Sequence, residues 1–291
     1  MYAGSSPSDT RPQSRKTSAA VTGSAFVSFK HSDGRTRLAT LRQKSPLRVL
    51  VPKLSGENTR LAVIANVSGG LVAGDRLRAS VEVAEGASVL VTTQAAEKVY
   101  RSTGAESYVG NRLNVAADAW CEWLPQGTIV FDAAKLRRRT DIVASGRARV
   151  LAGELLCLGR TASGEVFGQG QVFDDWRVRV DGKLEWASGL RLRDDLGRAL
   201  DGCAGFYGAR AMGTAVYIGP DCQQMAAEFG PRVASAGDGL YAGLSCLDRL
   251  LVVRWLGRDA MQVRTAFGEF WSKLRQMAAG LPAQMPSIWN I

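Results

Sequence analysis

The sequence contains a single histidine, His31, among its 291 residues. A serine or cysteine nucleophile activated by histidine would have to use this one side chain, and metal sites built on several imidazoles are excluded. His31 is also remote in sequence from the glycine turns and acidic clusters. Enzymatic chemistry would therefore have to rest on carboxylates or lysine.

Paired cysteines are missing as well. The chain has five cysteines that lie far apart without a C-x-x-C pair, which argues against both a zinc knuckle and a disulfide framework. We expect most of them to be buried thiols. They are Cys121, Cys157, Cys203, Cys222 and Cys246.

Long apolar runs do not occur. No window of about 18 apolar residues is present, and the first residues, "MYAGSSPSDTRPQSRKTSAA", lack the apolar region of a secretory signal. We therefore expect a cytoplasmic protein without a membrane partner. Residues 1–24, rich in Ser, Thr, Pro and Arg, are predicted to be a disordered polar lead-in, and residues 25–291 a single domain.

The stretch "NVSGGLVAGDRLRASVEV", residues 66–83, does not fit a phosphate-binding loop. Gly69 and Gly74 have the spacing of a P-loop, but Asp75 and Arg76 follow where that loop has Lys and Ser or Thr. The following residues alternate between apolar and polar, which predicts a strand instead of the helix that such a loop requires. We interpret the stretch as a glycine turn that leads into a strand.

Basic residues are in excess, with a formal net charge of +10. Such a charge favours acidic partners, whether nucleic acid, an anionic membrane or an acidic protein. The basic clusters, at residues 135–139 and 177–193, are interleaved with aspartates, and neither an aromatic stripe for RNA nor a basic helix for a DNA groove is apparent. A solvated face or a protein contact is favoured over nucleic-acid binding.

The pattern from Ala25 to about Val180 is that of a β protein. Short alternating segments are separated by turn signals, and the stretches at residues 83–94 and 115–126 resemble each other at a distance of 32 residues. The fold class predicted is mainly β, with stacked antiparallel or β-helix-like strands and two helices near the C-terminus. The clearest strands are predicted at Ala62–Val67, Arg76–Val83, Ser88–Thr93, Arg112–Ala116 and Thr128–Phe131.

Helical signals are confined to the last third of the chain. A short helix is predicted between Pro220 and Gly230-Pro231, and a longer one from its N-cap Asp259 to Gly280, with apolar residues at helical spacing. Between them, two apolar runs around Asp248-Arg249 predict a hairpin.

Six motifs occur together in one order: "GGLVAGDRL", "TTQAAEKVYRS", "CEWLPQGTIVFDAAKLRR", "GELLCLGRTASGEVFGQG", "YAGLSCLDRLLVVRWLG" and "PSIWN". With this set, residues 25–291 resemble the urease accessory protein D family, also called UreD or UreH. The resemblance implies a mainly β, non-catalytic scaffold. Its expected partners are accessory proteins F and G, the latter a GTPase, and the urease apoprotein, whose active site is loaded with nickel.

The resemblance also implies a transient nickel passage and no tightly bound cofactor. Weak, reversible binding suits isolated carboxylates better than a closed imidazole or thiolate cage. The candidates are Asp75, Glu97, Glu154 and Glu165. Each also has a structural interpretation: Asp75 as a turn cap, Glu97 and Glu165 as partners of Lys98 and Arg160, and Glu154 as a buried carboxylate with satisfied hydrogen bonds.

The chain departs from the family at two places. Several members carry a His-Pro pair where this chain has Asn66, Val67 and Ser68, and some have histidine where Gln169 stands. A passage in this chain would therefore have to use carboxylate or backbone oxygens.

Two other functions stay open from the sequence. The basic charge suits a nucleic-acid-binding β protein. The repeated strands suit a carboxylate-dependent β-helix glycosidase, which needs two carboxylates about 5 to 9 Å apart in an open groove.

Overall fold

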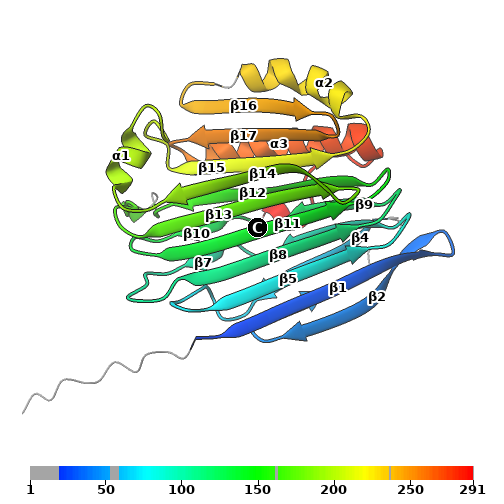
Figure 1. The fold of residues 1–291 in the computed structure, drawn as a ribbon, viewed down its shortest axis with the longest axis horizontal. Helices are drawn as coiled ribbons and strands as arrows, with labels where there is room; N and C mark the ends of the chain where they lie inside the picture. The colour runs from blue at the N-terminus through cyan, green and yellow to red at the C-terminus, as the bar shows by residue number, and fades with distance from the viewer. Residues whose placement is uncertain (1–19, 53–58, 161–162, 236, 291) are drawn as a thin grey trace, which may run out of the picture.

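The computed structural model describes residues 20–52, 59–160, 163–235 and 237–290. Two β-sheets face each other, and the helices α2 and α3 lie on the ten-stranded sheet (Figure 1). The first strand begins at Thr22, so residues 22–24 belong to the fold and the predicted lead-in was too long there. These residues are ordered because they pair with a second strand, Arg76–Val83. Residues 1–19 lie outside the described part of the chain.

One sheet has seven strands. In spatial order they are β14 (Lys183–Leu192), β13 (Gln171–Val180), β11 (Lys135–Ala144), β8 (Ser107–Val115), β5 (Arg76–Val83), β1 (Thr22–Ser32) and β2 (Arg35–Lys44).

The other sheet has ten strands. Eight lie in the order β16 (Leu240–Leu247), β17 (Leu250–Gly257), β15 (Ala211–Ile218), β12 (Arg149–Leu158), β9 (Trp120–Leu124), β6 (Ser88–Thr93), β4 (Arg60–Asn66) and β3 (Leu47–Leu50). The short strand β10 (Thr128–Val130) pairs with β12, and β7 (Glu97–Val99) pairs with β10.

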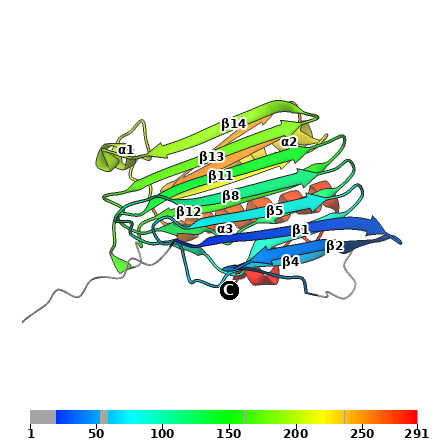
Figure 2. The ribbon, with the colours of Figure 1, turned by 60° about the horizontal axis from the view of Figure 1, so that its bottom comes forward.

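The centre of the molecule is a parallel β-solenoid of about four coils. The chain passes from one sheet to the other in each coil, so β5, β8, β11 and β13 stack in parallel in one sheet and β4, β6, β9 and β12 in the other. Ser88 pairs with Trp120, which is the 32-residue spacing seen in the sequence. The β-helix-like prediction is thus confirmed for the coils, while antiparallel pairs occur where β2, β3, β14 and β15 flank them. Figure 2 shows the stacked strands from below.

Alternating side chains build the core between the sheets. One row across the seven-stranded sheet consists of Val27, Val81, Leu113, Ile142 and Val178, which are paired in register and fully buried. Burial of such aliphatic side chains contributes about 1.5–3 kcal/mol each, before the entropic cost of folding. On each strand, the side chains at the alternate positions point to the outer face of the sheet.

The C-terminal helix α3 (Ala260–Ala279) covers the outer face of the ten-stranded sheet. Asp259 caps it as predicted, accepting a hydrogen bond from the Met261 amide, and Gly280 ends it in the left-handed conformation. Its predicted apolar face is confirmed, because Phe267 and Leu274 are fully buried. None of the helices among the described residues is both long and apolar enough to cross a membrane.

The shorter helices differ from the prediction. Helix α2 (Cys222–Ala234) continues past Pro231, because Phe229 and Val233 extend its buried face by one more turn. Helix α1 (Leu196–Asp201) was not predicted; it has only six residues, and Asp195 caps it.

A buried carboxylate fastens α3 to the sheet. Glu122 on β9 accepts hydrogen bonds from Trp271 Nε1 at 2.7 Å and Arg275 Nε at 3.0 Å, and from Trp120 Nε1 on its own strand. Arg275 also donates to the carbonyl oxygens of Pro282 and Gln284, which holds the segment after the helix. The charge is therefore paired and fully hydrogen-bonded, as a buried carboxylate requires.

Glycine at position 153 permits this close packing. A Cβ atom there would lie 2.6 Å from the Phe267 ring and 2.9 Å from the Trp271 ring. We expect Gly153→Ala to lower the free energy of unfolding by about 1–3 kcal/mol, because neither ring has room to move. Urea unfolding measures this. Gly243→Ala on β16, where a Cβ meets no atom within 4 Å, is the matched control and should stay within about 0.5 kcal/mol of the parent; equal losses for both variants would contradict the packing argument.

Candidate functional site

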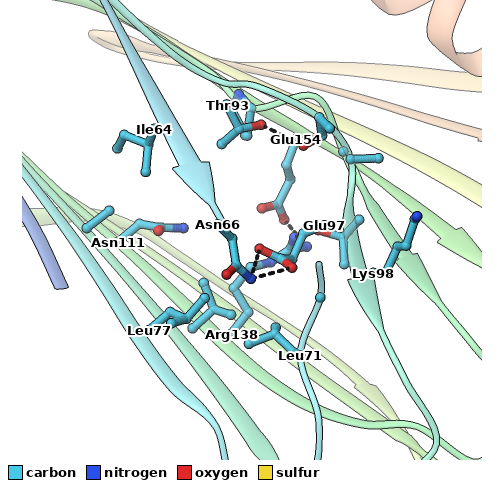
Figure 3. A pocket seen from close by; sticks show the side chains of 18 of the residues that line it. Ile64, Asn66, Leu71, Leu77, Thr93, Glu97, Lys98, Asn111, Arg138 and Glu154 are labelled. Atoms are coloured by element: carbon cyan, nitrogen blue, oxygen red, sulfur yellow. Dashed lines mark hydrogen bonds and ion pairs between the residues drawn. The ribbon is translucent and has the colours of Figure 1, made fainter. Parts of the chain in front are cut away.

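A cavity of about 220 Å³ lies between the two sheets at one end of the solenoid. Strands β5, β8 and β11 line it from the seven-stranded sheet, and β4, β6, β9 and β12 from the other. Figure 3 shows that Asn66, Glu97, Arg138 and Glu154 point into the same space. Polar side chains therefore gather at this end of the interior, whereas the other end is aliphatic.

The rim of the cavity is formed by exposed residues that include Gln94, Lys98 and Gly69. Gly70 has a φ of 143°, and a Cβ there would lie 2.5 Å from the Tyr100 ring and 2.7 Å from the Lys98 carbonyl oxygen. The glycine turn thus lets the chain lie against β7. Strand β5 follows the turn, which confirms that it is not a P-loop.

Glu97 stands on the cavity wall near this rim. It accepts hydrogen bonds from Asn66 Nδ2 at 3.0 and 3.2 Å, so its partner is this amide and not Lys98. Burial raises the pKa of Glu97 to about 7, and the charge of Asp75 adds to this, although the hydrogen bonds from Asn66 and the backbone oppose the shift. The carboxyl therefore changes its charge near neutral pH.

Glu154 forms the buried end of the cavity. Its side chain is 3% exposed and lies 2.8 Å from Arg138 Nη2, while Trp176 Nε1 donates to it at 2.9 Å. Arg138 also donates two hydrogen bonds to Asp174 and one to Thr128. The predicted alternative of a satisfied buried carboxylate is correct for Glu154, which nevertheless lines the cavity.

The two carboxyls around Arg138 hold protons differently. Burial raises the pKa of Glu154 well above its usual value, and the charge of Asp174 adds to this, while Arg138 opposes it. The pKa of Asp174 is lowered, because Arg138 and the hydrogen bond with Glu154 outweigh its burial. Of the pair, Glu154 is the carboxyl that retains its proton longer as the pH rises.

Trp123 is a cavity-lining residue whose indole lacks a hydrogen-bond partner in the described part of the chain. Its indole Nε1 is buried and has no hydrogen-bond partner among the described residues, and the side chain lines the cavity. A buried donor without a partner costs about 1–3 kcal/mol. The cavity volume of about 220 Å³ exceeds the roughly 30 Å³ that one water molecule takes up in the liquid, so the cavity has room for water.

The other two candidates lie outside the cavity lining. Asp75 accepts hydrogen bonds from the Val21 and Val72 amides at 2.8 and 3.0 Å, which ties the start of β1 to the glycine turn. Glu165 pairs with Arg160 at 2.8 Å on the surface, and this pairing lowers the pKa of Glu165. Both geometries agree with the structural interpretations drawn from the sequence.

The donors available for a metal are sparse. Within the described ranges, no group of three His, Cys, Asp or Glu side chains is close enough together to hold a metal ion. His31 is exposed on β1, away from the cavity. The carboxyls of Glu97 and Glu154 are the acidic groups among the described residues that line the cavity.

Sequence reasoning missed the polar residues on the seven-stranded side. Arg138 was grouped with a basic cluster, although alternation along β11 places it inward with Leu136 and Ile142 and leaves Arg137 outside. This alternation was the signal that could have found it. The same alternation along β13 places Asp174 inward with Val172 and Trp176. On the ten-stranded side, Trp123 carries no such signal, because all five residues of β9 are buried.

A segment distant in sequence holds part of the cavity wall. Pro125 and Gly127 line the cavity, and Gln126 between them donates through Nε2 to the Ile288 carbonyl oxygen in the 3₁₀ helix η2 (Ser287–Asn290). Arg264 donates to the carbonyl and the side-chain oxygens of Gln126 at 3.1 and 2.9 Å.

Comparison with known proteins agrees with this geometry. The profile of the UreD urease accessory protein family matches residues 21–290. The chain belongs to this family. It is 40% identical to urease accessory protein UreD of Magnetococcus marinus over 97% of this chain and 98% of the relative. It is 36% identical to the UreD proteins of Rhizobium rhizogenes, with 97% of each chain covered, and of a Methylobacterium species, with 88% and 90% covered.

In this UreD-family chain, we expect Arg138→Met to lower the free energy of unfolding by about 3–5 kcal/mol, because it leaves two buried carboxyls without their cation. Arg137→Met, one residue along the same strand, removes an exposed pair with Glu106 and should cost less than about 1 kcal/mol. Urea unfolding compares the two. Equal losses would show that the buried cluster is not needed for stability.

Glu97 makes stability depend on pH. Its pKa is about 7 in the folded chain against 4.5 as the reference value, so the unfolded chain releases the proton first and stability falls as the pH rises from about 4.5 to 7. Glu97→Gln removes this loss and should raise the free energy of unfolding by about 1–3 kcal/mol at about pH 8, with little change near pH 4.5.

Denaturant titrations at the two pH values test this expectation. The exposed Glu85, in the turn before β6, provides the control, since Glu85→Gln should shift the free energy by less than about 0.5 kcal/mol at either pH. A Glu97→Gln variant that follows the parent at both pH values would refute the assigned burial of the charge.

Proposed function

We propose that the protein assists the maturation of urease and catalyses no reaction of its own. The observation that carries this proposal is the family match over residues 21–290, together with relatives of 36–40% identity that are named urease accessory protein UreD. The alignment covers nearly all of both chains for two of these relatives, so the likeness extends to the whole fold.

The partners we propose are accessory proteins F and G, of which G is a GTPase, and the urease apoprotein. In this cytoplasmic complex the protein acts as a scaffold, and nickel is the cargo. The motif set and the family match support this assignment.

We further propose that nickel passes through the cavity between the sheets. Glu97 stands near the exposed rim with Asn66, and Glu154 stands at the buried end, so oxygen donors occur at both ends of one space. Carboxylate and amide oxygens bind nickel less tightly than imidazole or thiolate clusters, and a conduit needs such reversible binding. Asn66, whose amide nitrogen donates to Glu97, lies at the place where several family members have a His-Pro pair.

The proton on each carboxyl then controls the passage. A carboxyl must lose its proton before it binds a cation. Because the pKa of Glu97 is about 7, its affinity for nickel rises as the pH passes through neutrality. The oxygens of Asp75 already bind backbone amides, and those of Glu165 bind Arg160. These two residues stay predictions as nickel ligands, and the path proposed through the cavity does not use them.

The glycosidase alternative finds little support. The carboxyls of Glu154 and Asp174 both bind Arg138 and are 3% and 2% exposed, so a sugar ring could not reach between them.

Co-expression tests the accessory role. Urease produced with proteins F and G should gain its nickel-dependent activity only when this chain is also present. Full activation in its absence would remove the basis for the proposal.

Substitutions in the cavity test the passage. Glu97→Gln and Glu154→Gln should each lower the rate of urease activation by about tenfold, because each replaces a carboxyl that can ionise and bind nickel by an amide that cannot. Glu165→Gln, outside the cavity, should activate urease like the parent. Co-purification with the partners should be unchanged in all three variants. Normal activation by both cavity variants would refute the passage while leaving the accessory role intact.

A further inference from the structure

The outer face of the seven-stranded sheet carries a concentration of arginines. Alternation along β5, β8, β11 and β13 turns their side chains outward, opposite to the aliphatic core. In Figures 1 and 2, α2 and α3 lie on the ten-stranded sheet, so neither covers this face. We call it the basic face, and define it by Arg76, Arg78, Arg112, Arg137, Arg177 and Arg179.

Aromatic rings organise these cations. Arg76, Tyr108, Arg137, Phe173 and Arg191 form one row across five paired strands. The guanidinium of Arg76 lies 5.2 Å from the centre of the Tyr108 ring, and those of Arg137 and Arg191 lie 4.7 and 5.3 Å from the Phe173 ring. Such contacts hold the guanidinium groups in place on the sheet surface.

Several of the cations lack a carboxylate. Arg137 pairs with Glu106 and Arg191 with Asp175. In contrast, no ion pair within the described part of the chain involves Arg76, Arg78, Arg177 or Arg179. The excess positive charge is thus concentrated on an open, rigid sheet surface. A second copy of the same face would be repelled, so the surface calls for a partner of opposite charge.

The face favours a protein over a nucleic acid. Asp141 and Asp175 are interleaved with the arginines and pair with Arg139 and Arg191, which interrupts the row of free cations that a continuous phosphate backbone would need. A protein surface can instead place separate acidic groups opposite the unpaired arginines. Bases stack on free aromatic faces, but the Tyr108 and Phe173 rings are already occupied by guanidinium groups.

We propose that the basic face is the docking surface for an acidic protein partner. The identity of that partner rests on the proposed function, which supplies three candidates: urease apoprotein and accessory proteins F and G. The surface itself rests on charge and geometry alone. Docking there leaves the cavity and the helical side of the molecule accessible.

The experiment compares two double variants of equal net charge. Arg112→Glu with Arg177→Glu reverses charge on the basic face, and Arg258→Glu with Lys273→Glu reverses it on the β17–α3 side.

The probes for the chain alone are a glutamate-rich peptide of about 20 residues and a DNA strand of equal length, at about 50 and 200 mM salt. Arg112→Gln with Arg177→Gln provides a milder version should the reversed charges impair folding, which urea unfolding checks.

We expect the face variant to bind the peptide about tenfold more weakly than the parent, and the control variant to stay within about twofold. Equal binding by the two double variants would overturn the proposal. Tighter binding of DNA than of peptide at about 200 mM salt, lost only in the face variant, would assign the surface to nucleic acid and also overturn it.

Titrations with each purified partner separate this inference from the proposed function. A partner that binds the parent and the control variant but not the face variant supports both the docking surface and the accessory role. If the partners bind all variants equally, the docking surface is wrong and the accessory role stands. If no partner binds the parent while the peptide result holds, the accessory role fails and the surface stands.

Discussion

The parallel register between successive coils is the constraint on which the rest of the structure depends. It stacks equivalent positions of β5, β8, β11 and β13, so a residue that faces inward in one coil has inward neighbours in the next. Arg138 reaches Asp174 in this way, and it reaches Glu154 across the space between the two sheets. Arg137, one residue before it, lies beside Tyr108 and Phe173 on the opposite side. The polar cavity and the basic face are thus two sides of the same strands.

Much of the fold was predictable because local patterns determine it. Alternation located the strands, the 32-residue spacing located consecutive coils, and the cap at Asp259 with its apolar stripe located α3. The two shorter helices are the exceptions, because their local sequence patterns did not predict their extent. Pro231 is tolerated because Phe229 and Val233 bury the last turn of α2, and the six residues of α1 are too few to show a helical period.

The site was predictable only in part. The motifs pointed to Glu97 and Glu154, which the structure brings to one cavity, and to Asp75 and Glu165, which it does not. The difference arises from pairing across coils, which one sequence does not reveal. Only the folded chain brings the Asn66 amide to Glu97, or leaves the buried indole nitrogen of Trp123 without a hydrogen-bond partner among the described residues.

The contact between Gln126 and the helix η2 has a consequence for biosynthesis. These groups are separated by 162 positions, and a ribosome makes the chain from its N-terminus. The coils can stack as they emerge, since each needs only the coil before it. The stretch that includes Pro125 and Gly127, in contrast, obtains its final hydrogen bonds only after η2 has been translated. A nascent chain can therefore possess its solenoid well before its cavity is complete.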